Sequence, residues 1–452
     1  MRYIPSTDDQ LTEMLEHIGV SSFEELIKNV PNNFRLKSKL KLPKALSEQE
    51  LEEYLVKISQ KNSDFYGMKP LVGAGAYRHF IPQAVRSLLQ REEFWTCYTP
   101  YQPELSQGTL QCMFEYQTYI SRLTGMDIVV PSIFDGASAT AEAVLMALRL
   151  SHKNKIIVSS LIHPHYLETI KTYIAPHNII INEIPYNKGL INHTELENLL
   201  DNDTAAVIVQ NPNFLGGIEN LTKIVSLSHQ NKALVIDVNT ESMSWGLLKK
   251  PGDLDIDIVI GNTQSFGIDL SFGGPHNAFL ATRRKFIRQI PGRIAGETKD
   301  KNGNRAFVMT FRAREQDIRR EKATSNICTN HNLNVITSNI YLSLMGTDGI
   351  YQLSLLNAKM AHYLEKLLLN TGQFEPLFNY PYFNEFLLRY KGPNVEKFND
   401  IFYQNNFIPP LSIQSFYPEK HFNNTFLFAI TEIFNRDELN QIVNLFSPKG
   451  GK

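Results

Sequence analysis

The chain has 452 residues, of which 45 are Lys or Arg and 46 are Asp or Glu, so its formal net charge is −1. Hydrophobic residues make up 42% and charged residues 20%, which is typical of a folded globular protein and excludes a disordered chain. The balanced charge also argues against a general nucleic-acid binder, because no basic excess would hold phosphates. The length predicts two or three domains and enough core for an enzyme.

Targeting segments, membrane spans and metal sites are not expected. The N-terminal residues do not resemble a signal peptide, and no apolar run of about 18 residues predicts a membrane span. Cys97, Cys112 and Cys328 are too far apart for a disulfide framework or a zinc site, which favours a reducing, cytoplasmic setting. His163 and His165 are spaced like a metal pair but lack a third ligand, so we interpret them as strand or loop residues.

The first 60 residues predict an N-terminal helical arm. Apolar residues recur at helical spacing over 11–18, and a glycine follows them. Ser22 with Glu25, and Ser47 with Glu50, have the spacing of a capping box at the start of a helix. We expect the arm to pack either on a partner chain or on the rest of its own chain.

Residues 61–330 are expected to form a large domain. Before a helix at 110–123, the motifs GAGAYRHF and YTPYQPELSQG have the Gly, Pro and polar residues of functional loops. Apolar runs then alternate with helical segments about every 25 residues, as in β-α-β units of a mainly parallel sheet, which binds ligands at the carboxyl ends of its strands. The expected strands are 127–134, 155–159, 179–184, 205–209, 233–237, 257–260 and 278–282.

A charged, Arg-rich stretch at 292–330 ends the large domain, and residues 331–452 are expected to form a small C-terminal α/β domain. A long helix is predicted over 331–370. Strand-like FNEFLLRY, helical VEKFNDIFY, strand-like NTFLFAI and a last helix near DELNQIVNLF follow it.

Two positions in the large domain match landmarks of the fold-type-I pyridoxal-phosphate enzymes. Gly136, Ala137 and Ser138 follow the first strand and open a helix, where small residues and a helix N-terminus favour a phosphate. Asp237 ends a later strand, where these enzymes pair a carboxylate with the pyridinium nitrogen. By themselves such residues are more often turn formers or helix caps.

The third landmark, the lysine that binds the cofactor, is missing. It would fall about 25–35 residues after Asp237, but Gln264 stands there and no lysine lies between Lys250 and Lys285. A glutamine amide is neither basic nor nucleophilic, so it cannot form a Schiff base. We therefore expect the fold of a pyridoxal-phosphate transferase with a vestigial cofactor pocket that holds no covalent cofactor.

Several long stretches resemble the P-protein of the glycine cleavage system, glycine dehydrogenase (decarboxylating), and above all the alpha chains of its two-chain bacterial form. They span residues 3 to about 330, and the C-terminal third matches in order and length with weaker motifs. The matching stretches are YIPSTDDQLTEMLEHIGV, GAGAYRHFIP, YTPYQPELSQGTLQCMFEYQT, FDGASATAEA, QSFGIDLSFGGP and REQDIRREKATSNICTN.

The resemblance implies an α2β2 heterotetramer whose beta subunit carries pyridoxal phosphate on a lysine, in agreement with Gln264 in this chain. The active site would lie between the alpha and beta chains. The complex would decarboxylate glycine, release CO2 and pass the aminomethyl group to the lipoyl arm of the H-protein. No nucleic-acid or membrane partner is implied.

The loop YTPYQPELSQG is the candidate contribution of this chain to the shared site. Tyr98 and Tyr101 offer hydroxyl donors on a Pro-stiffened loop as candidate catalytic groups, and Gln102, Glu104 and Ser106 are candidate substrate-binding residues. In the alternative interpretation the tyrosines only pack at the interface, where Tyr is common.

Two other functions remain open at this stage. A complete aminotransferase or decarboxylase would use an atypical lysine such as Lys250, whereas a scaffold or regulatory homologue would take no part in the active site.

Cys328 suggests a nucleophile, but a small buried residue is the better interpretation. An anion site or a salt-bridge network would equally explain Arg312, Arg314, Arg319 and Arg320.

Overall fold

The computed structural model describes residues 5–38, 40–62, 67–95, 97, 99–327, 330–393 and 395–447. They belong to two compact units, Met1–Asp64 and Phe65–Lys452. No helix of the described chain is both long and apolar enough to cross a membrane.

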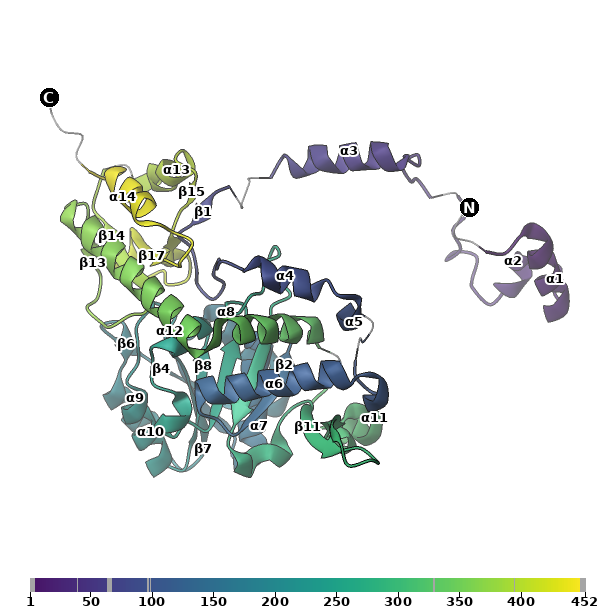
Figure 1. Ribbon diagram of the computed structural model, residues 1–452, viewed down its shortest axis with the longest axis horizontal. Helices are drawn as coiled ribbons and strands as arrows, with labels where there is room; N and C mark the ends of the chain where they lie inside the picture. Colours follow the sequence, from purple (N-terminus) through teal and green to yellow (C-terminus); the bar gives the residue numbers. More distant parts are fainter. Residues whose placement is uncertain are drawn as a thin grey trace. The chain divides into compact units, whose positions relative to one another are not determined.

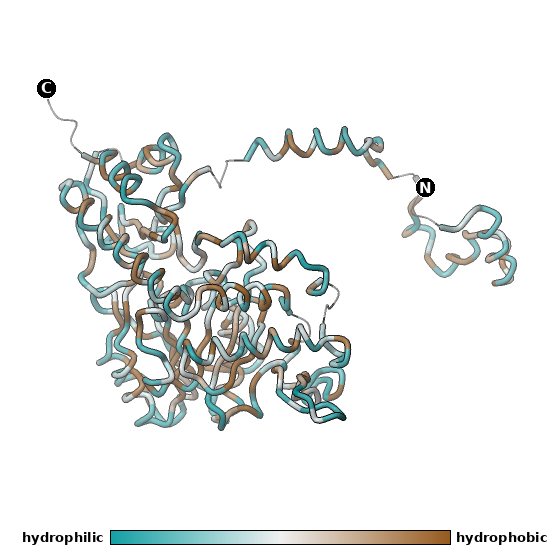
Figure 2. Tube along the Cα trace, in the orientation of Figure 1, coloured by the Kyte–Doolittle hydropathy of each residue, from teal (hydrophilic) through white to brown (hydrophobic). Residues whose placement is uncertain are grey.

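The N-terminal unit consists of helices, as predicted. Ser47 starts its third helix with a complete capping box, whereas at Ser22 only half of the predicted box forms, because the Glu25 carboxylate turns to Ser21. None of the described residues in its helices is buried, and apolar and polar residues alternate along them (Figure 2). The helices are α1 (Asp8–Ile18), α2 (Phe23–Leu26) and α3 (Glu48–Ser59).

The second unit is built on a 7-stranded sheet of order β2-β10-β9-β8-β7-β3-β4, in which β10 alone runs against the others. Every predicted strand of the large domain is confirmed. β-branched residues make up more than half of β3, β7 and β9, which are buried along their full lengths as is typical of parallel sheets. The strands are β2 (Ile128–Ile133), β3 (Lys155–Ser159), β4 (Ile180–Ile184), β7 (Thr204–Gln210), β8 (Leu234–Asn239), β9 (Ile258–Asn262) and β10 (Ala278–Thr282).

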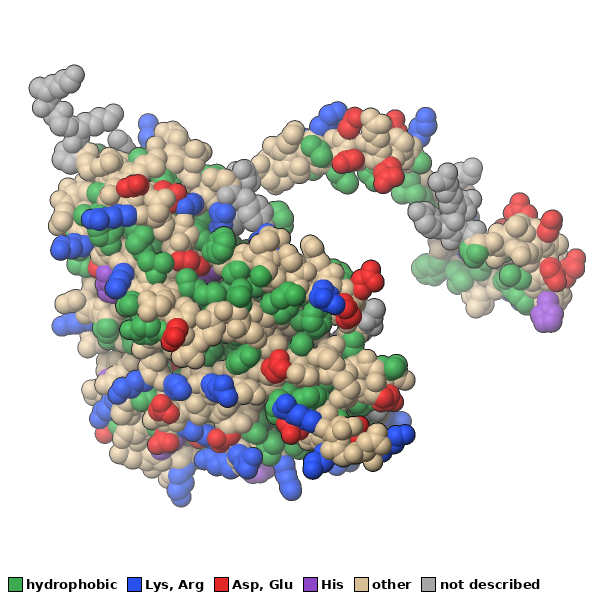
Figure 3. Space-filling model, viewed as in Figure 1, with side chains coloured by type: hydrophobic (Ala, Val, Ile, Leu, Met, Phe, Trp, Pro, Cys, Tyr) green, Lys and Arg blue, Asp and Glu red, His purple; other side chains and the backbone are tan. Residues whose placement is uncertain are grey.

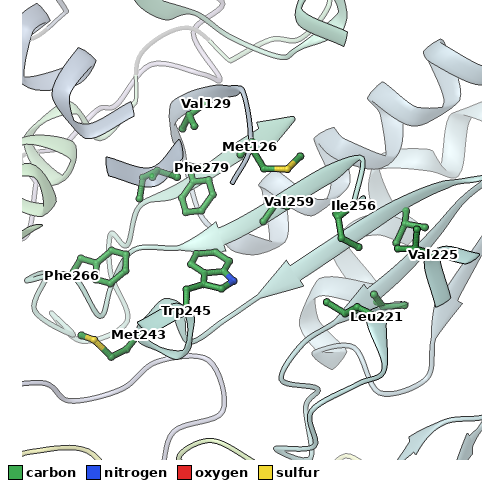
Figure 4. Close-up of a cluster of buried hydrophobic side chains, with 14 of the residues drawn as sticks. Met126, Val129, Leu221, Val225, Met243, Trp245, Ile256, Val259, Phe266 and Phe279 are labelled. Atoms are coloured by element: carbon green, nitrogen blue, oxygen red, sulfur yellow. The ribbon is translucent and has the colours of Figure 1, made fainter. Parts of the chain in front are cut away.

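Helices cover both faces of this sheet. Successive strand residues point to opposite faces, so Val207 and Val209 join one hydrophobic cluster while Ile208 joins the other. In the first cluster Trp245 lies beside Phe279, with ring centroids 5.7 Å apart (Figure 4). The helices of the first face are α6 (Gln107–Thr124), α9 (His193–Leu199), α10 (Leu221–Gln230) and the first half of α12 (Asn332–Asn370), and those of the second are α7 (Gly136–Ser151) and α8 (Pro164–Ile174).

Helix α12 extends from this sheet into the C-terminal residues. Its first half lies beside α6 (Figure 1), and its second half contributes Ala361, Leu364 and Leu368 to a separate core. Gly346 interrupts the helix with a φ of 60°. The seven-stranded sheet with its helices is called the large-sheet part below, and the second half of α12 with the elements after it is called the C-terminal part.

The C-terminal part contains a 4-stranded sheet of order β13-β14-β17-β16, covered by helices. All the elements predicted after residue 370 are present. A strand pair links the part to the beginning of the unit, because β1 (Lys69–Pro70) pairs with β15 (Phe407–Ile408). The other elements are β13 (Phe374–Pro376), β14 (Glu385–Tyr390), α13 (Phe398–Tyr403), β16 (Leu411–Ser412), β17 (Thr425–Ala429) and α14 (Arg436–Asn444).

Three regions of the large domain hold more structure than the sequence predicted. The supposed loops of 61–106 contain short helices, and the Arg-rich stretch contains a β-hairpin and a short helix. A β-hairpin between two strands of the large sheet was also missed. These elements are α4 (Gln83–Leu89), α5 (Glu92–Trp95), β5 (Tyr186–Asn187), β6 (Leu190–Ile191), β11 (Ile294–Lys299), β12 (Arg305–Thr310) and α11 (Gln316–Arg319).

Candidate functional site

The carboxyl edge of the large sheet brings the three predicted landmarks together. Gly136 follows β2, Asp237 lies near the end of β8, and Gln264 follows β9. Strand β10 enters from the same edge, since Ala278 pairs with the last residue of β2 and with the last residue of β9. The order of the strands therefore produces the geometry that the spacing of these residues predicted.

The turn at Gly136 is closed by the chain's own side chains. The Asp135 carboxylate caps α7 and accepts a hydrogen bond from the Ser138 backbone N–H at 2.7 Å. A Cβ atom added to Gly136 would lie 2.0 Å from the Tyr166 hydroxyl, so Tyr166 fills the space in front of the turn. A phosphate at this place would be close to the Asp135 carboxylate. That carboxylate already interacts with the positive end of the helix dipole, so a second anion would gain little there.

Asp237 is a deeply buried carboxyl group. It is 1% exposed, and neither of its carboxyl oxygens has a hydrogen-bond partner in the described parts of the chain. Burial raises the pKa of Asp237 to about 8, because the charged form is not solvated there. Such a group suits a cationic ring nitrogen, which is the role predicted for it.

Gln264 is bonded within the chain on both sides of its amide. Its oxygen accepts a hydrogen bond from the Tyr77 backbone N–H at 2.9 Å, and its nitrogen donates to the Ile268 carbonyl at 3.0 Å. The side chain is 3% exposed. The residue at the position predicted for the cofactor lysine therefore has a structural role.

Tyr77 belongs to residues 73–80, here called the strap, which cross the carboxyl edge of the sheet. The Ala74 carbonyl accepts a hydrogen bond from Nε2 of His163 at 3.1 Å, and the Gly75 carbonyl accepts one from the Asn262 amide at 3.4 Å. The strap thus contacts residues that follow β3 and end β9.

His163 has a defined protonation state in this arrangement. Its Nδ1 accepts the His165 backbone N–H at 3.2 Å, so Nε2 carries the proton that it shares with Ala74. Burial lowers the pKa of His163 to about 4, which keeps the ring neutral. It stacks on Tyr166 with ring centroids 5.0 Å apart. The residue caps α8, a more specific role than the strand or loop position predicted for it.

These residues do not fit a pyridoxal phosphate held by this chain. Asp237 suits the ring nitrogen, but Gln264 offers no amine and its amide is already paired. The Asp135 carboxylate already accepts the Ser138 N–H at the start of α7, where the phosphate was predicted to bind.

A cavity of about 620 Å³ is lined in part by the strap. Its wall combines strap residues with the loop after Gln264, on which Phe272 is fully exposed. No sequence pattern predicted this cavity, although residues of two Gly-rich motifs, GAGAYRHF and QSFGIDLSFGGP, line it. Among the lining residues are Ala76, Arg78, His79, Phe80, Leu270 and Phe272.

The loop YTPYQPELSQG lies against the β11–β12 hairpin, and none of its described residues lines this cavity. Tyr101, Gln102 and Glu104 are exposed, and the Arg293 guanidinium lies 4.8 Å above the Tyr101 ring. Ser106 is buried, with its hydroxyl 3.2 Å from the Cys97 sulfur. Tyr98 lies outside the described residues.

Among the remaining candidates, Lys250, Arg314 and Arg319 lie or bond elsewhere in the described parts of the chain. Lys250 is exposed and precedes β9, so it lies at the opposite edge from Gln264. Arg314 donates to backbone carbonyls of Arg288, Ile290 and Gly292 rather than to acids. Arg319 likewise donates to a carbonyl and Arg320 is exposed, whereas Cys328 and the side chain of Arg312 lie outside the described part of the chain.

Comparison with known proteins gives a consistent result. The chain matches the family model of the glycine cleavage system P-protein over residues 1–446. Proteins named probable glycine dehydrogenase (decarboxylating) subunit 1 are 42% identical in Carboxydothermus hydrogenoformans, over 98% of this chain and 99% of the relative, and 43% identical in Brevibacillus brevis, over 97% and 96%. These names describe one chain of an enzyme with more than one kind of subunit.

Solved structures confirm the predicted fold class. The crystal structure of glycine decarboxylase (P-protein) of the glycine cleavage system, in inhibitor-bound form, has a TM-score of 0.87 at 37% identity and covers 99% of both chains. The glutamate decarboxylase of Lactobacillus brevis shares only the fold, with a TM-score of 0.68 at 12% identity over 92% of this chain and 95% of that chain. The full-length family match and the subunit 1 relatives show that this chain belongs to the glycine cleavage system P-protein family.

Proposed function

We propose that this chain is the alpha subunit of a glycine dehydrogenase (decarboxylating) and that a separate beta subunit holds the pyridoxal phosphate. The observation that carries the proposal is Gln264, which takes the position of the cofactor lysine and has both sides of its amide bonded inside the chain. The relatives' names support the activity, and the words 'subunit 1' in those names support the existence of a second kind of chain.

In this proposal the reacting groups sit on the beta subunit, and the alpha subunit completes the site from outside. The complex releases CO2 from glycine and passes the aminomethyl group to the lipoyl arm of the H-protein. Tyr101, Gln102 and Glu104 are exposed on one loop and able to reach a partner. Their donors and acceptors would orient the substrate and exclude water at a shared site.

Exposed apolar side chains support an association of this kind. Phe80, Leu88, Trp95 and Leu105 are all more than two-fifths exposed, which is costly for a monomer when such residues lie together. Hydrophobic side chains gather over α4 and the first half of α12 on the face shown in Figure 3. We propose an α2β2 assembly in which these side chains are buried.

Co-expression with a beta subunit tests the proposal. The two chains should co-purify, and glycine–bicarbonate exchange should require both of them. Purified alone, this chain should lack the visible absorption of a lysine-bound cofactor. A borohydride-stable cofactor adduct on this chain would contradict the proposal, and full exchange activity of the beta subunit without it would favour a scaffold.

A further inference from the structure

The strap ends in a buried histidine held between two buried glutamates from different parts of the fold. Nδ1 of His79 lies 2.9 Å from Oε2 of Glu432, which follows β17, and Nε2 lies 3.1 Å from Oε2 of Glu241, which follows β8. The three side chains are 2%, 6% and 2% exposed, in the order His79, Glu432 and Glu241. With a carboxylate at each ring nitrogen, both nitrogens act as donors.

Charge explains why His79 is needed at this point. Two buried carboxylates repel each other and lose their hydration, and only a cation between them offsets both costs. Burial by itself would lower the pKa of His79, but Glu432 and Glu241 raise it to about 10, so the imidazolium form is held. His79 therefore joins the large-sheet part, through Glu241, to the C-terminal part, through Glu432.

The rest of the strap repeats this double attachment. The Ala74 N–H and the Tyr77 hydroxyl each donate to one carboxylate oxygen of Glu385 on β14, both at 2.7 Å. The Phe80 N–H donates to Glu432 at 2.8 Å. On the other side, Gln264 of the large-sheet part accepts the Tyr77 N–H. The strap is thus bonded to both parts along most of its length.

Two glycines allow the strap to pass between the parts. A Cβ atom on Gly73 would lie 2.5 Å from the Tyr77 ring and 2.7 Å from the Glu385 carboxylate. Gly75 has a φ of +99°, a backbone conformation that residues other than glycine rarely adopt. These contacts are specific to the present path of the strap.

We propose that the strap, with His79 at its end, is an internal lock that holds the large-sheet part and the C-terminal part in one closed arrangement. The lock keeps the wall of the adjacent cavity in place, because strap residues form part of that wall. This inference rests on the contacts of the strap and does not depend on the proposed function.

Distance measurements on His79→Gln in the full chain test the lock. Spin labels would be placed at the exposed Thr172 on α8 and the exposed Asn399 on α13, through unnatural amino acids that leave the native cysteines in place. The wild type should give one narrow distribution of distances between the labels, and His79→Gln a broader or longer one. The matched control is His229→Gln, because His229 also pairs with a carboxylate, Asp257 at 2.8 Å, but does not touch the strap.

Hydrogen exchange of the backbone amides of Ala74, Tyr77 and Phe80 gives a second measurement. In His79→Gln their exchange should accelerate at least tenfold while the amides of β7 and β8 keep their rates. An unchanged distance distribution in folded His79→Gln, or an exchange increase spread evenly over the unit, would overturn the lock. If His79→Gln does not fold, Glu432→Gln should show the same changes to a smaller extent, and its failure to do so would equally overturn it.

Discussion

The side-chain oxygen of Gln264 accepts a hydrogen bond from the backbone N–H of Tyr77 at 2.9 Å, although the two residues are 187 positions apart in the sequence. In a cofactor-bearing chain the corresponding side chain would be an amine directed at its ligand. Here the same position fastens the strap to the sheet. At the position where the sequence spacing predicts a cofactor lysine, the glutamine amide is therefore used for a structural contact.

Gln264→Lys is expected to lower the stability of the protein, and it is not expected to create a cofactor site. The lysine would remove the acceptor for the Tyr77 N–H and bury an ammonium group, at a cost of about 2–4 kcal/mol. Pyridoxal phosphate would still meet the Asp135 carboxylate at the start of α7. Urea unfolding and visible spectra with added pyridoxal phosphate measure the two effects. Gln111→Lys is the control, because Gln111 is exposed on α6, and a stable visible band in Gln264→Lys would contradict the expectation.

Asp237→Asn should change how stability depends on pH. Burial raises the pKa of Asp237 from 3.8 to about 8, so between these values the unfolded chain releases a proton that the folded chain keeps. The contribution of this carboxyl group to the free energy of unfolding is fully present below about pH 4. It falls by about 1.4 kcal/mol per pH unit as the pH rises toward 8. Asparagine does not titrate, so the stability of the variant relative to wild type should increase between pH 5 and pH 8.

Urea unfolding of both proteins across that range measures the difference. Asp201→Asn provides the control, because a hydrogen bond from Lys155 lowers the pKa of the Asp201 carboxyl, which is then ionised in the folded and the unfolded chain. That variant should shift stability by a constant amount. A constant offset for Asp237→Asn as well would show that Asp237 is ionised in the folded protein.

The strands of the large sheet were predictable because runs of consecutive apolar residues indicate buried strands. Strands such as β7 and β9 are buried along their whole length and carry runs of consecutive apolar residues, as is typical of strands covered on both faces. The β11–β12 hairpin lacks this signal, since most of its residues are only half-buried or exposed and it carries charges such as Glu297 and Arg305. Helix α4 has 7 residues, too few for a helical period to stand out.

The candidate site was predictable only in part, for a similar reason. The distance in sequence from Asp237 identified Gln264 as the residue at the predicted lysine position, because only the short connection from β8 to β9 separates the two positions. The partners of these positions come from distant segments. The packing of the strap brings Tyr77 to Gln264 and His79 to Glu432. Because each pair is far apart in the sequence, no local sequence pattern predicts these contacts.

Glu315→Gln should strongly destabilise the region that supports the candidate loop. Arg293 and Glu315 form a bidentate ion pair whose side chains are 5% and 6% exposed. Neutralising the glutamate leaves a buried guanidinium without a counter-charge, which costs about 3–5 kcal/mol. Glu297→Gln in the exposed pair with Arg305 is the control and should cost less than about 1 kcal/mol. Equal unfolding midpoints for the two variants would show that the buried pair contributes no more than the exposed one.

Tyr101→Phe separates a role in the reaction from a role in packing. Phenylalanine keeps the ring that lies 4.8 Å below the Arg293 guanidinium and removes only the hydroxyl. If that hydroxyl donates to the shared site, turnover of the reconstituted complex should fall about tenfold, which corresponds to the loss of one hydrogen bond of roughly 1.4 kcal/mol. Assembly with the beta subunit should be unaffected. Tyr351→Phe, at an exposed tyrosine of α12, should leave turnover unchanged. Equal kcat values for wild type and Tyr101→Phe would confine Tyr101 to packing, because the ring is then the only part of the side chain that matters.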